Sequence, residues 1–111
     1  MAIYSNLFID QGSTFSADID VTDSDGNALD LTNYTVAGQM RRSYASLTAT
    51  NFTATVENAS EGTVRIKLTA TETNDLKAGR YVYDVEITSP DSIVTRVVEG
   101  QIEIMPGVTR A

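Results

Sequence analysis

Apolar and polar residues alternate one by one through much of this chain. The clearest run starts after Gly79, where every second residue is apolar: Tyr81, Tyr83, Val85 and Ile87. Successive side chains of a β-strand point to opposite faces, so a period of two is typical of a strand with one buried face and one wet face. The run therefore predicts a half-buried strand.

The same alternation recurs along the chain and predicts about seven to eight strands. The expected ranges are 3–9, 14–22, 34–42, 52–56, 64–68, 80–87 and 93–105, with a short return at 28–31. Polar turns separate them at the spacing of a β-sandwich. Gly38 predicts a bulge or a close backbone approach, and Gly100 a kink, because glycine inside a strand marks such places. Val97 and Val98 are adjacent, so both face the core only across a bulge.

Two segments depart from strand periodicity. Residues 69–77 predict one short helical turn, with Thr71 as its N-cap and Glu72 and Asp75 in its first turn. Residues 43–48 predict an irregular loop that is small and polar apart from Tyr44 and Leu47. Beyond Pro106 and Gly107, residues 108–111 are expected to form a flexible tail of a single domain, 1–111.

Composition agrees with an all-β fold and narrows the chemistry. Thr, Val and Ile together number 33 of the 111 residues, and these side chains suit a pleated surface. The chain has no cysteine, histidine or tryptophan. Stability must then come from packing, and serine–histidine pairs, cysteine–histidine pairs and most zinc sites are excluded.

The net charge argues against a nucleic-acid partner, and the first apolar segment argues against insertion in a membrane. A net charge of −7 opposes binding to nucleic acid, whose phosphates need a concentrated basic face. The nearest thing to such a face is the pair Arg41–Arg42. Asn6 and Asp10 interrupt the first apolar segment, so neither a signal peptide nor a membrane helix is expected there. The expectation is a soluble chain made in the cytoplasm of its host.

Paired carboxylates are the one arrangement that could support hydrolysis. Asp18 and Asp20 are two residues apart on one strand face, as are Asp84 and Glu86. A glycosidase-like pair is possible in principle. A solvated outer face is the favoured interpretation, because a sandwich this small lacks a deep cleft. We therefore expect no enzyme activity and no catalytic residues.

A calcium site is a second possibility. Asp23, Asp25 and Asn27 have the spacing that opens an EF-hand loop, but Ala28 stands where that loop needs glycine and its closing glutamate is absent. A turn whose aspartates bond their own backbone explains these residues equally well and is favoured. We expect no metal and no cofactor.

Five large apolar or aromatic residues have no clear place in the alternation. They are Tyr4, Phe8, Tyr34, Tyr44 and Leu47. A core position is slightly favoured for each, but aromatic residues also anchor protein contacts. Tyr44 and Leu47 are the best candidates for surface contacts because of their irregular loop. Together with Arg41 and Arg42 they form the predicted protein-contact residues.

The order of motifs resembles that of a known family. Gly79-Arg80-Tyr81 resembles the tyrosine corner of immunoglobulin-like sandwiches, with Tyr83 where antibody domains carry a cysteine. Other motifs precede it in order: Asp10–Phe15, Asp23–Gly26, Leu29–Val36, Gly62–Val64 and Leu68–Ala70. The whole is similar to small immunoglobulin-like virion proteins of tailed bacteriophages, especially marine and cyanobacterial phages, and to the N-terminal domain of phage baseplate upper proteins.

The resemblance implies an immunoglobulin-like antiparallel β-sandwich without a disulfide, stapled by Tyr81. It implies a non-catalytic assembly or decoration subunit of the virion, docking on repeated tail, baseplate, neck or capsid subunits. Its partners would be other virion proteins and copies of itself. Edge strands offer unpaired backbone groups to a neighbour, so we expect the assembly contacts at the N-terminal segment and the last strand. A carbohydrate- or cell-surface-binding module is the alternative, which the absence of tryptophan makes less favoured.

Overall fold

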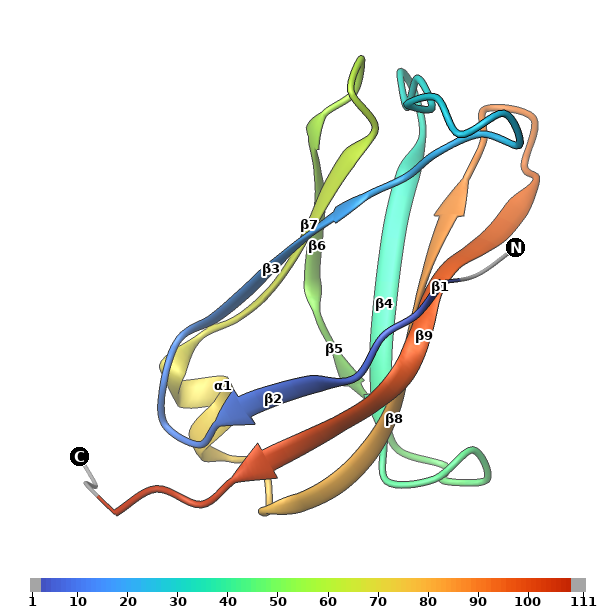
Figure 1. Ribbon diagram of the computed structural model, residues 1–111. Coiled ribbons are helices and arrows are strands. Elements are labelled where there is room, and N and C mark those ends of the chain that lie inside the picture. The colour runs from blue at the N-terminus through green and yellow to red at the C-terminus, as the bar shows by residue number, and fades with distance from the viewer. Residues whose placement is uncertain (1–2, 109–111) are drawn as a thin grey trace.

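The computed structural model describes residues 3–108, which form two packed β-sheets and one short helix (Figure 1). The elements in chain order are β1 Ile3–Tyr4, β2 Leu7–Asp10, β3 Phe15–Asp20, β4 Thr35–Arg41, β5 Thr50–Asn51, β6 Thr53–Asn58, β7 Thr63–Leu68, α1 Ala70–Asn74, β8 Gly79–Thr88 and β9 Val94–Met105.

The larger sheet has the order β1-β9-β8-β4-β5, with β2 also paired to β9, and the smaller sheet has the order β3-β7-β6. All strand pairs are antiparallel except β1 and β2, which run parallel to β9. The expected immunoglobulin-like sandwich without a disulfide is confirmed. The described residues hold nine strands rather than seven to eight, because the first expected strand is split at Ser5–Asn6 and the expected strand at 52–56 is preceded by β5.

The core lies between the sheets and is built from the alternating apolar positions. β7 and β8 show the pattern most fully, with every second residue buried. The fully buried side chains are Ile9, Leu31, Met40, Val64, Ile66, Leu68, Thr73, Val85, Ile102 and Ile104. Burying one aliphatic side chain contributes about 1.5–3 kcal/mol. The alternation therefore supplies the stability that a disulfide provides in antibody domains.

A chain of three aromatic rings joins the two sheets through the core. The ring of Phe52 lies 6.3 Å from that of Phe15 on β3 and 6.3 Å from that of Tyr83 on β8, edge-on to the latter. Phe52 stands where the chain leaves β5 in the larger sheet and enters β6 in the smaller one. Its ring lies against Gly38, where an added Cβ would come within 3.1 Å of it. The close approach expected at Gly38 is therefore present, made by the Phe52 ring and by the backbone carbonyl of Asp84, which would lie 3.2 Å from an added Cβ.

The strand irregularities fall close to where the sequence places them. Val85 pairs with Val98 and Glu86 with Arg96, which leaves Val97 as an extra residue. Val97 and Val98 are both buried, so the expected bulge is confirmed. The β8–β9 ladder continues without a shift at Gly100, so the irregularity of the register lies at Val97. Gly100 instead leaves room for the carbonyl group of Ser5, which an added Cβ would strike.

The helical turn after β7 is confirmed, but its cap is not the expected residue. The hydroxyl of Thr69 accepts a hydrogen bond from the amide of Glu72 (3.1 Å), and the carboxylate of Glu72 accepts one from the amide of Thr69 (2.8 Å). This reciprocal pair is a capping box. Thr71 lies exposed inside the helix, and Asp75 is the C-cap rather than a first-turn residue.

The expected tail at 108–111 lies outside the described residues except for Val108, which is exposed. Among the residues 3–108, no helix is long and apolar enough to cross a membrane.

Candidate functional site

Tyr81 links the start of β8 to the turn before it. Its hydroxyl donates a 2.9 Å hydrogen bond to the carbonyl of Lys77, four residues earlier. That is the geometry of a tyrosine corner. The guanidinium of Arg42 lies over the ring of Tyr81, 4.9 Å from its centre, and donates to the carbonyl of Ala78 at 3.5 Å. Both side chains therefore brace the end of the sandwich at which β8 begins.

The loop between β4 and β5, residues 42–49, projects from the same end of the sandwich (Figure 1). The guanidinium of Arg41 holds it by donating to the carbonyl of Ser46 at 2.7 Å. The amide of Ser43 donates to the hydroxyl of Ser46 at 3.1 Å, and the amide of Ser46 to the carbonyl of Ser43 at 3.1 Å. Tyr44 is 81% exposed and Leu47 is 99% exposed on this braced loop.

The structure thus divides the four predicted contact residues into two kinds. Tyr44 and Leu47 present apolar surface to solvent, while Arg41 and Arg42 are engaged with the loop and with Tyr81. Of the other unplaced residues, only Tyr34 packs against the core. The slight preference for the core is wrong for Tyr4 and Phe8, which are exposed on β1 and β2, and equally wrong for Tyr44 and Leu47.

An open strand edge lies on the smaller sheet. β3 pairs only with β7 among the described strands, so the six residues Phe15–Asp20 have unpaired backbone groups along their other side. Such an edge can accept a strand from another chain. β9 is more protected, because β1 and β2 cover much of its outer edge.

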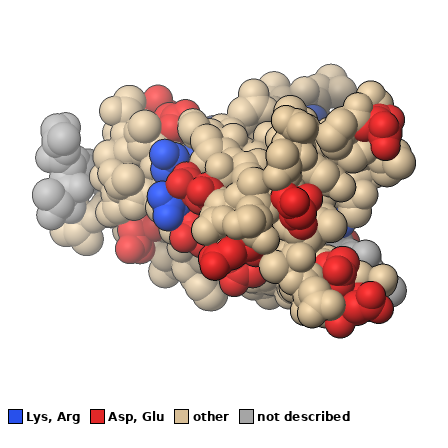
Figure 2. All heavy atoms as spheres, turned by 90° about the horizontal axis from the view of Figure 1, so that it is seen from above, with Lys and Arg blue, Asp and Glu red and all other residues tan. Residues whose placement is uncertain are grey.

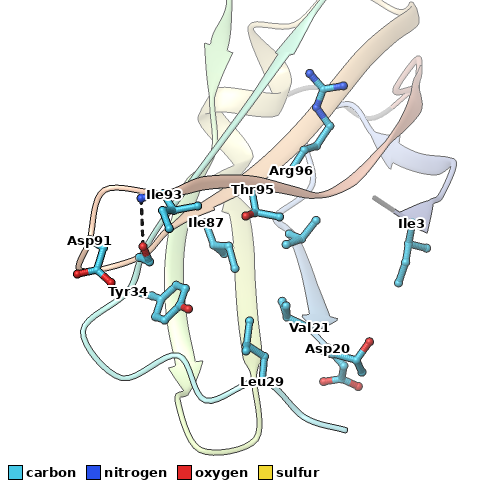
Figure 3. A pocket seen from close by; sticks show the side chains of 13 residues that line it. Ile3, Asp20, Val21, Leu29, Tyr34, Ile87, Asp91, Ile93, Thr95 and Arg96 are labelled. Carbon is cyan, nitrogen blue, oxygen red and sulfur yellow. Dashed lines mark hydrogen bonds between the residues drawn. The ribbon is translucent and has the colours of Figure 1, made fainter. Parts of the chain in front are cut away.

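A cavity of about 270 Å³ opens between the sheets at the end opposite the β4–β5 loop (Figure 3). Its apolar lining residues are Ile3, Val21, Leu29, Tyr34, Ile87, Ile93 and Val97, and its polar lining residues are Asp20, Thr22, Ser89, Asp91, Thr95 and Arg96. Asp20 and Asp91 lie at its margin (Figure 3). The turn at 89–93 closes one side, where the amide of Ser89 donates to the carbonyl of Ile93 at 2.9 Å. We call this hollow the end pocket.

Sequence reasoning missed the end pocket because four separate segments contribute to it. The alternation assigns each side chain to a face of its own strand but does not say where the sheets diverge. One signal was present: Ile93 and Val94 follow a polar turn, and both remain exposed in the folded chain.

The first candidate carboxylate pair lies on the outer surface of the smaller sheet. Asp18 accepts hydrogen bonds of 2.6 and 3.2 Å from Arg65. The Arg65 guanidinium holds the pKa of Asp18 below its usual value. Asp20 accepts a 3.1 Å bond from the hydroxyl of Thr63. A general acid at neutral pH needs a raised pKa, so the shift at Asp18 has the opposite direction.

The second pair lies on the outer face of the larger sheet. Asp84 forms an ion pair of 3.3 Å with Arg96. Glu86 is paired in register with Arg96 across the β8–β9 ladder. Both positions belong to the solvent side of an alternating strand, where cross-strand charge pairs are ordinary. This arrangement agrees with the solvated outer face favoured from the sequence.

The residues of the calcium alternative form a turn that bonds its own backbone. Oδ1 of Asp23 accepts hydrogen bonds from the amides of Asp25 (2.9 Å) and Asn27 (3.0 Å). Within residues 3–108, no three acidic, histidine or cysteine side chains are grouped so as to hold a metal ion. The favoured interpretation explains the geometry of this turn without a ligand.

No family model matches this chain, and no curated protein is significantly similar to it. Among solved structures, the chain is similar to an internalin-like protein of Listeria monocytogenes, with a TM-score of 0.47, 17% identity, and coverage of 96% of this chain but 28% of that one. A family 123 glycoside hydrolase from Clostridium perfringens gives a TM-score of 0.44, 13% identity, and coverage of 96% and 24%. The chain thus spans about a quarter of each neighbour, and at this level neither likeness bears on its activity.

Proposed function

We propose that this chain is a non-catalytic docking module, a structural subunit of a tailed-phage virion that binds repeated subunits of the tail, baseplate, neck or capsid. The observation that carries the proposal is the braced β4–β5 loop, on which Leu47 and Tyr44 are exposed to solvent. The choice of a phage virion as the assembly rests on the resemblance of the ordered motifs to phage virion proteins.

The β4–β5 loop is already fixed, with its apolar side chains exposed, before any partner binds. An apolar side chain that is fully exposed gains free energy when a partner removes it from water. Arg41 and the Ser43–Ser46 bonds fix the loop beforehand, which reduces the ordering entropy lost on docking. Tyrosine is also one of the residues enriched at protein interfaces.

Further surfaces support docking to more than one neighbour. Tyr4 and Phe8 expose apolar surface on β1 and β2, the N-terminal segment expected to make assembly contacts. The open edge of β3 can accept a strand from another chain. These surfaces would allow the chain to contact more than one neighbouring subunit.

The proposal predicts presence of the chain in assembled particles. Particles of the phage that encodes it are purified through a density gradient, and their proteins are identified by mass spectrometry. The chain should be found at a constant ratio to the major structural proteins across the particle peak. Its absence from mature particles would contradict the proposal. The carbohydrate-binding alternative predicts specific signals on a glycan array, and we expect none above background.

A further inference from the structure

We propose that copies of this chain associate head to tail, with the apolar tip of the β4–β5 loop of one copy docked in the end pocket of the next. Leu47 is the inserted side chain. This inference deepens the proposed function and rests on it, because it names a second copy of the chain as one of the docking partners.

The loop and the end pocket lie at opposite ends of one strand. Tyr34, which lines the pocket, directly precedes β4, and the loop begins directly after β4 ends at Arg41. At about 3.3 Å per residue, the seven residues of β4 separate the two by about 20 Å. The loop of a copy therefore cannot fill its own pocket, and the contact must form between copies.

The end pocket has the size and lining for an inserted side chain. An apolar cavity of about 150 Å³ is sufficient to hold a benzene-sized group. The end pocket measures about 270 Å³ and is open to one side. Most ligand sites for larger molecules are bigger than this. One or two apolar side chains, such as Leu47 with part of Tyr44, match its volume and its aliphatic and aromatic wall.

The pocket end of the sandwich is acidic. The segments 20–35, 57–63 and 88–95 contain no Lys or Arg, and their acidic residues are Asp20, Asp23, Asp25, Asp30, Glu57, Glu61 and Asp91. Figure 2 looks down on this end and shows acidic side chains spread across it. Arg96 also lines the pocket, but its charge is paired with Asp84 at 3.3 Å.

The β4–β5 loop and the strands that flank it carry the complementary charge. Residues 36–56 contain Arg41 and Arg42 and no Asp or Glu. Within the described residues, neither arginine forms an ion pair with a carboxylate. Docking Leu47 would bring both guanidinium groups toward the acidic margin formed by Asp20 and Asp91. Such complementarity fixes orientation and accelerates association.

A head-to-tail contact joins two different surfaces, so every copy keeps one free loop and one free pocket. Repetition of such a contact closes into a ring or continues as a filament. Both outcomes suit a subunit present in many copies. One loop and one pocket bury a small area, so we expect weak association of the isolated chain, detectable at high protein concentration and low salt.

The test uses two variants that each destroy one half of the contact. Leu47→Ser removes the inserted side chain, and Thr95→Trp fills the pocket from β9, where Thr95 lies at its wall (Figure 3). Val108→Ser is the matched control, because it removes an equally exposed apolar side chain elsewhere (97% exposed, against 99% for Leu47). All the changed positions are exposed, so thermal unfolding should match the wild type and verify folding.

Sedimentation velocity at about 50 mM salt then measures association. The wild type and Val108→Ser should form a concentration-dependent series beyond the dimer. Leu47→Ser should associate at least about tenfold more weakly than the wild type, the loss expected for one buried leucine side chain. Thr95→Trp should show a similar loss, because its pocket is filled. An equal mixture of the two variants should form a heterodimer and stop there, because only one intact loop and one intact pocket can meet.

Three results would overturn the inference. These are a wild type that stays monomeric at the highest concentration, a Leu47→Ser variant that associates like the wild type, and a variant mixture that stays monomeric. A monomeric wild type that is nevertheless present in purified particles refutes the head-to-tail contact alone. Absence from particles refutes the proposed function, whatever the sedimentation shows.

Discussion

The hydroxyl of Tyr83 donates a 2.7 Å hydrogen bond to the carbonyl of Ser5, 78 residues earlier in the chain. Tyr83 is paired in register with Gly100 on β9. Because Gly100 has no side chain, the backbone of Ser5 passes over it and reaches the tyrosine. The bond ties β8 to the segment between β1 and β2 within the larger sheet, whereas the disulfide of antibody domains joins the two sheets.

Removing this hydroxyl should destabilise the fold. Tyr83→Phe keeps the ring contact with Phe52 but leaves the partly buried carbonyl of Ser5 without its donor. We expect the free energy of unfolding to fall by about 1–2 kcal/mol. Urea denaturation measures it, and Tyr44→Phe is the control because Tyr44 is exposed. A change below the error of the measurement would show that water replaces the tyrosine at Ser5.

The raised pKa of Tyr83 should make the fold less stable at alkaline pH. Burial raises the pKa of Tyr83 above its ordinary value of 10.0, the bond to Ser5 only partly opposing it. The folded state then holds this proton more tightly than the unfolded state. Its contribution is complete below pH 10.0 and is lost as the pH rises through the higher folded value.

Urea denaturation from pH 9 to about pH 11 tests this loss of stability. The wild type and Tyr44→Phe should lose stability steeply over the upper part of the range. Tyr83→Phe should lose distinctly less, since residue 83 no longer titrates. Identical slopes in all three proteins would contradict the raised pKa.

Gly100 should tolerate no side chain. Gly100→Ala directs a methyl group at the backbone carbonyl of Ser5, which cannot move without shifting β1 and β2. We expect a loss of about 1–3 kcal/mol or more, the usual cost of overpacking a core. Thermal unfolding measures it. Gln101→Ala, on the opposite face of β9, is the control, and an equal effect of both changes would contradict the close approach.

The alternation predicts strand faces well and strand partners poorly. β8 is assigned correctly because its alternating residues meet a core on one side only. Nothing in residues 3–9 shows that β1 and β2 pair parallel to β9, because that partner lies more than 90 residues away. The change of sheet at Phe52 is equally hidden, since a strand keeps its period when it changes partners. Long-range packing decides both.

The helix cap gives a prediction with an internal control. Thr69→Ala removes the side chain that accepts from the amide of Glu72 and should cost about 1 kcal/mol. Thr71→Ala changes an exposed residue within the helix and should cost little or stabilise slightly. Urea denaturation of the two variants distinguishes them. The spacing Thr69-x-x-Glu72 is a capping-box pattern and could have identified Thr69 from the sequence.

The acid side of the stability profile depends on Asp18. Arg65 lowers the pKa of Asp18 below 3.8, so the pair stabilises the fold above that pH. This contribution is lost as the pH falls through the lower folded value. In NMR titrations, the carboxyl carbon of Asp18 should titrate below pH 3.8, and Arg65→Gln should return the midpoint toward that value. An unchanged midpoint would show that Arg65 does not set the pKa.

The candidate site was only partly predictable. An irregular loop with two apolar residues identifies Tyr44 and Leu47 as candidates, because apolar residues outside the alternation have no assigned place in the core. The sequence does not reveal that Arg41 and Arg42 brace the loop and Tyr81 rather than project, because this depends on hydrogen bonds that form only after folding. The end pocket depends on the divergence of two sheets and has no local pattern.

Cross-linking at residue 47 tests most directly whether the β4–β5 loop docks on protein. A photoreactive amino acid replaces Leu47 in one preparation and Val108 in a control, and purified particles containing each are irradiated. We expect one dominant cross-linked protein product from position 47 and weak, scattered products from position 108. Particles that incorporate the chain but yield no protein cross-link from position 47 would contradict this expectation.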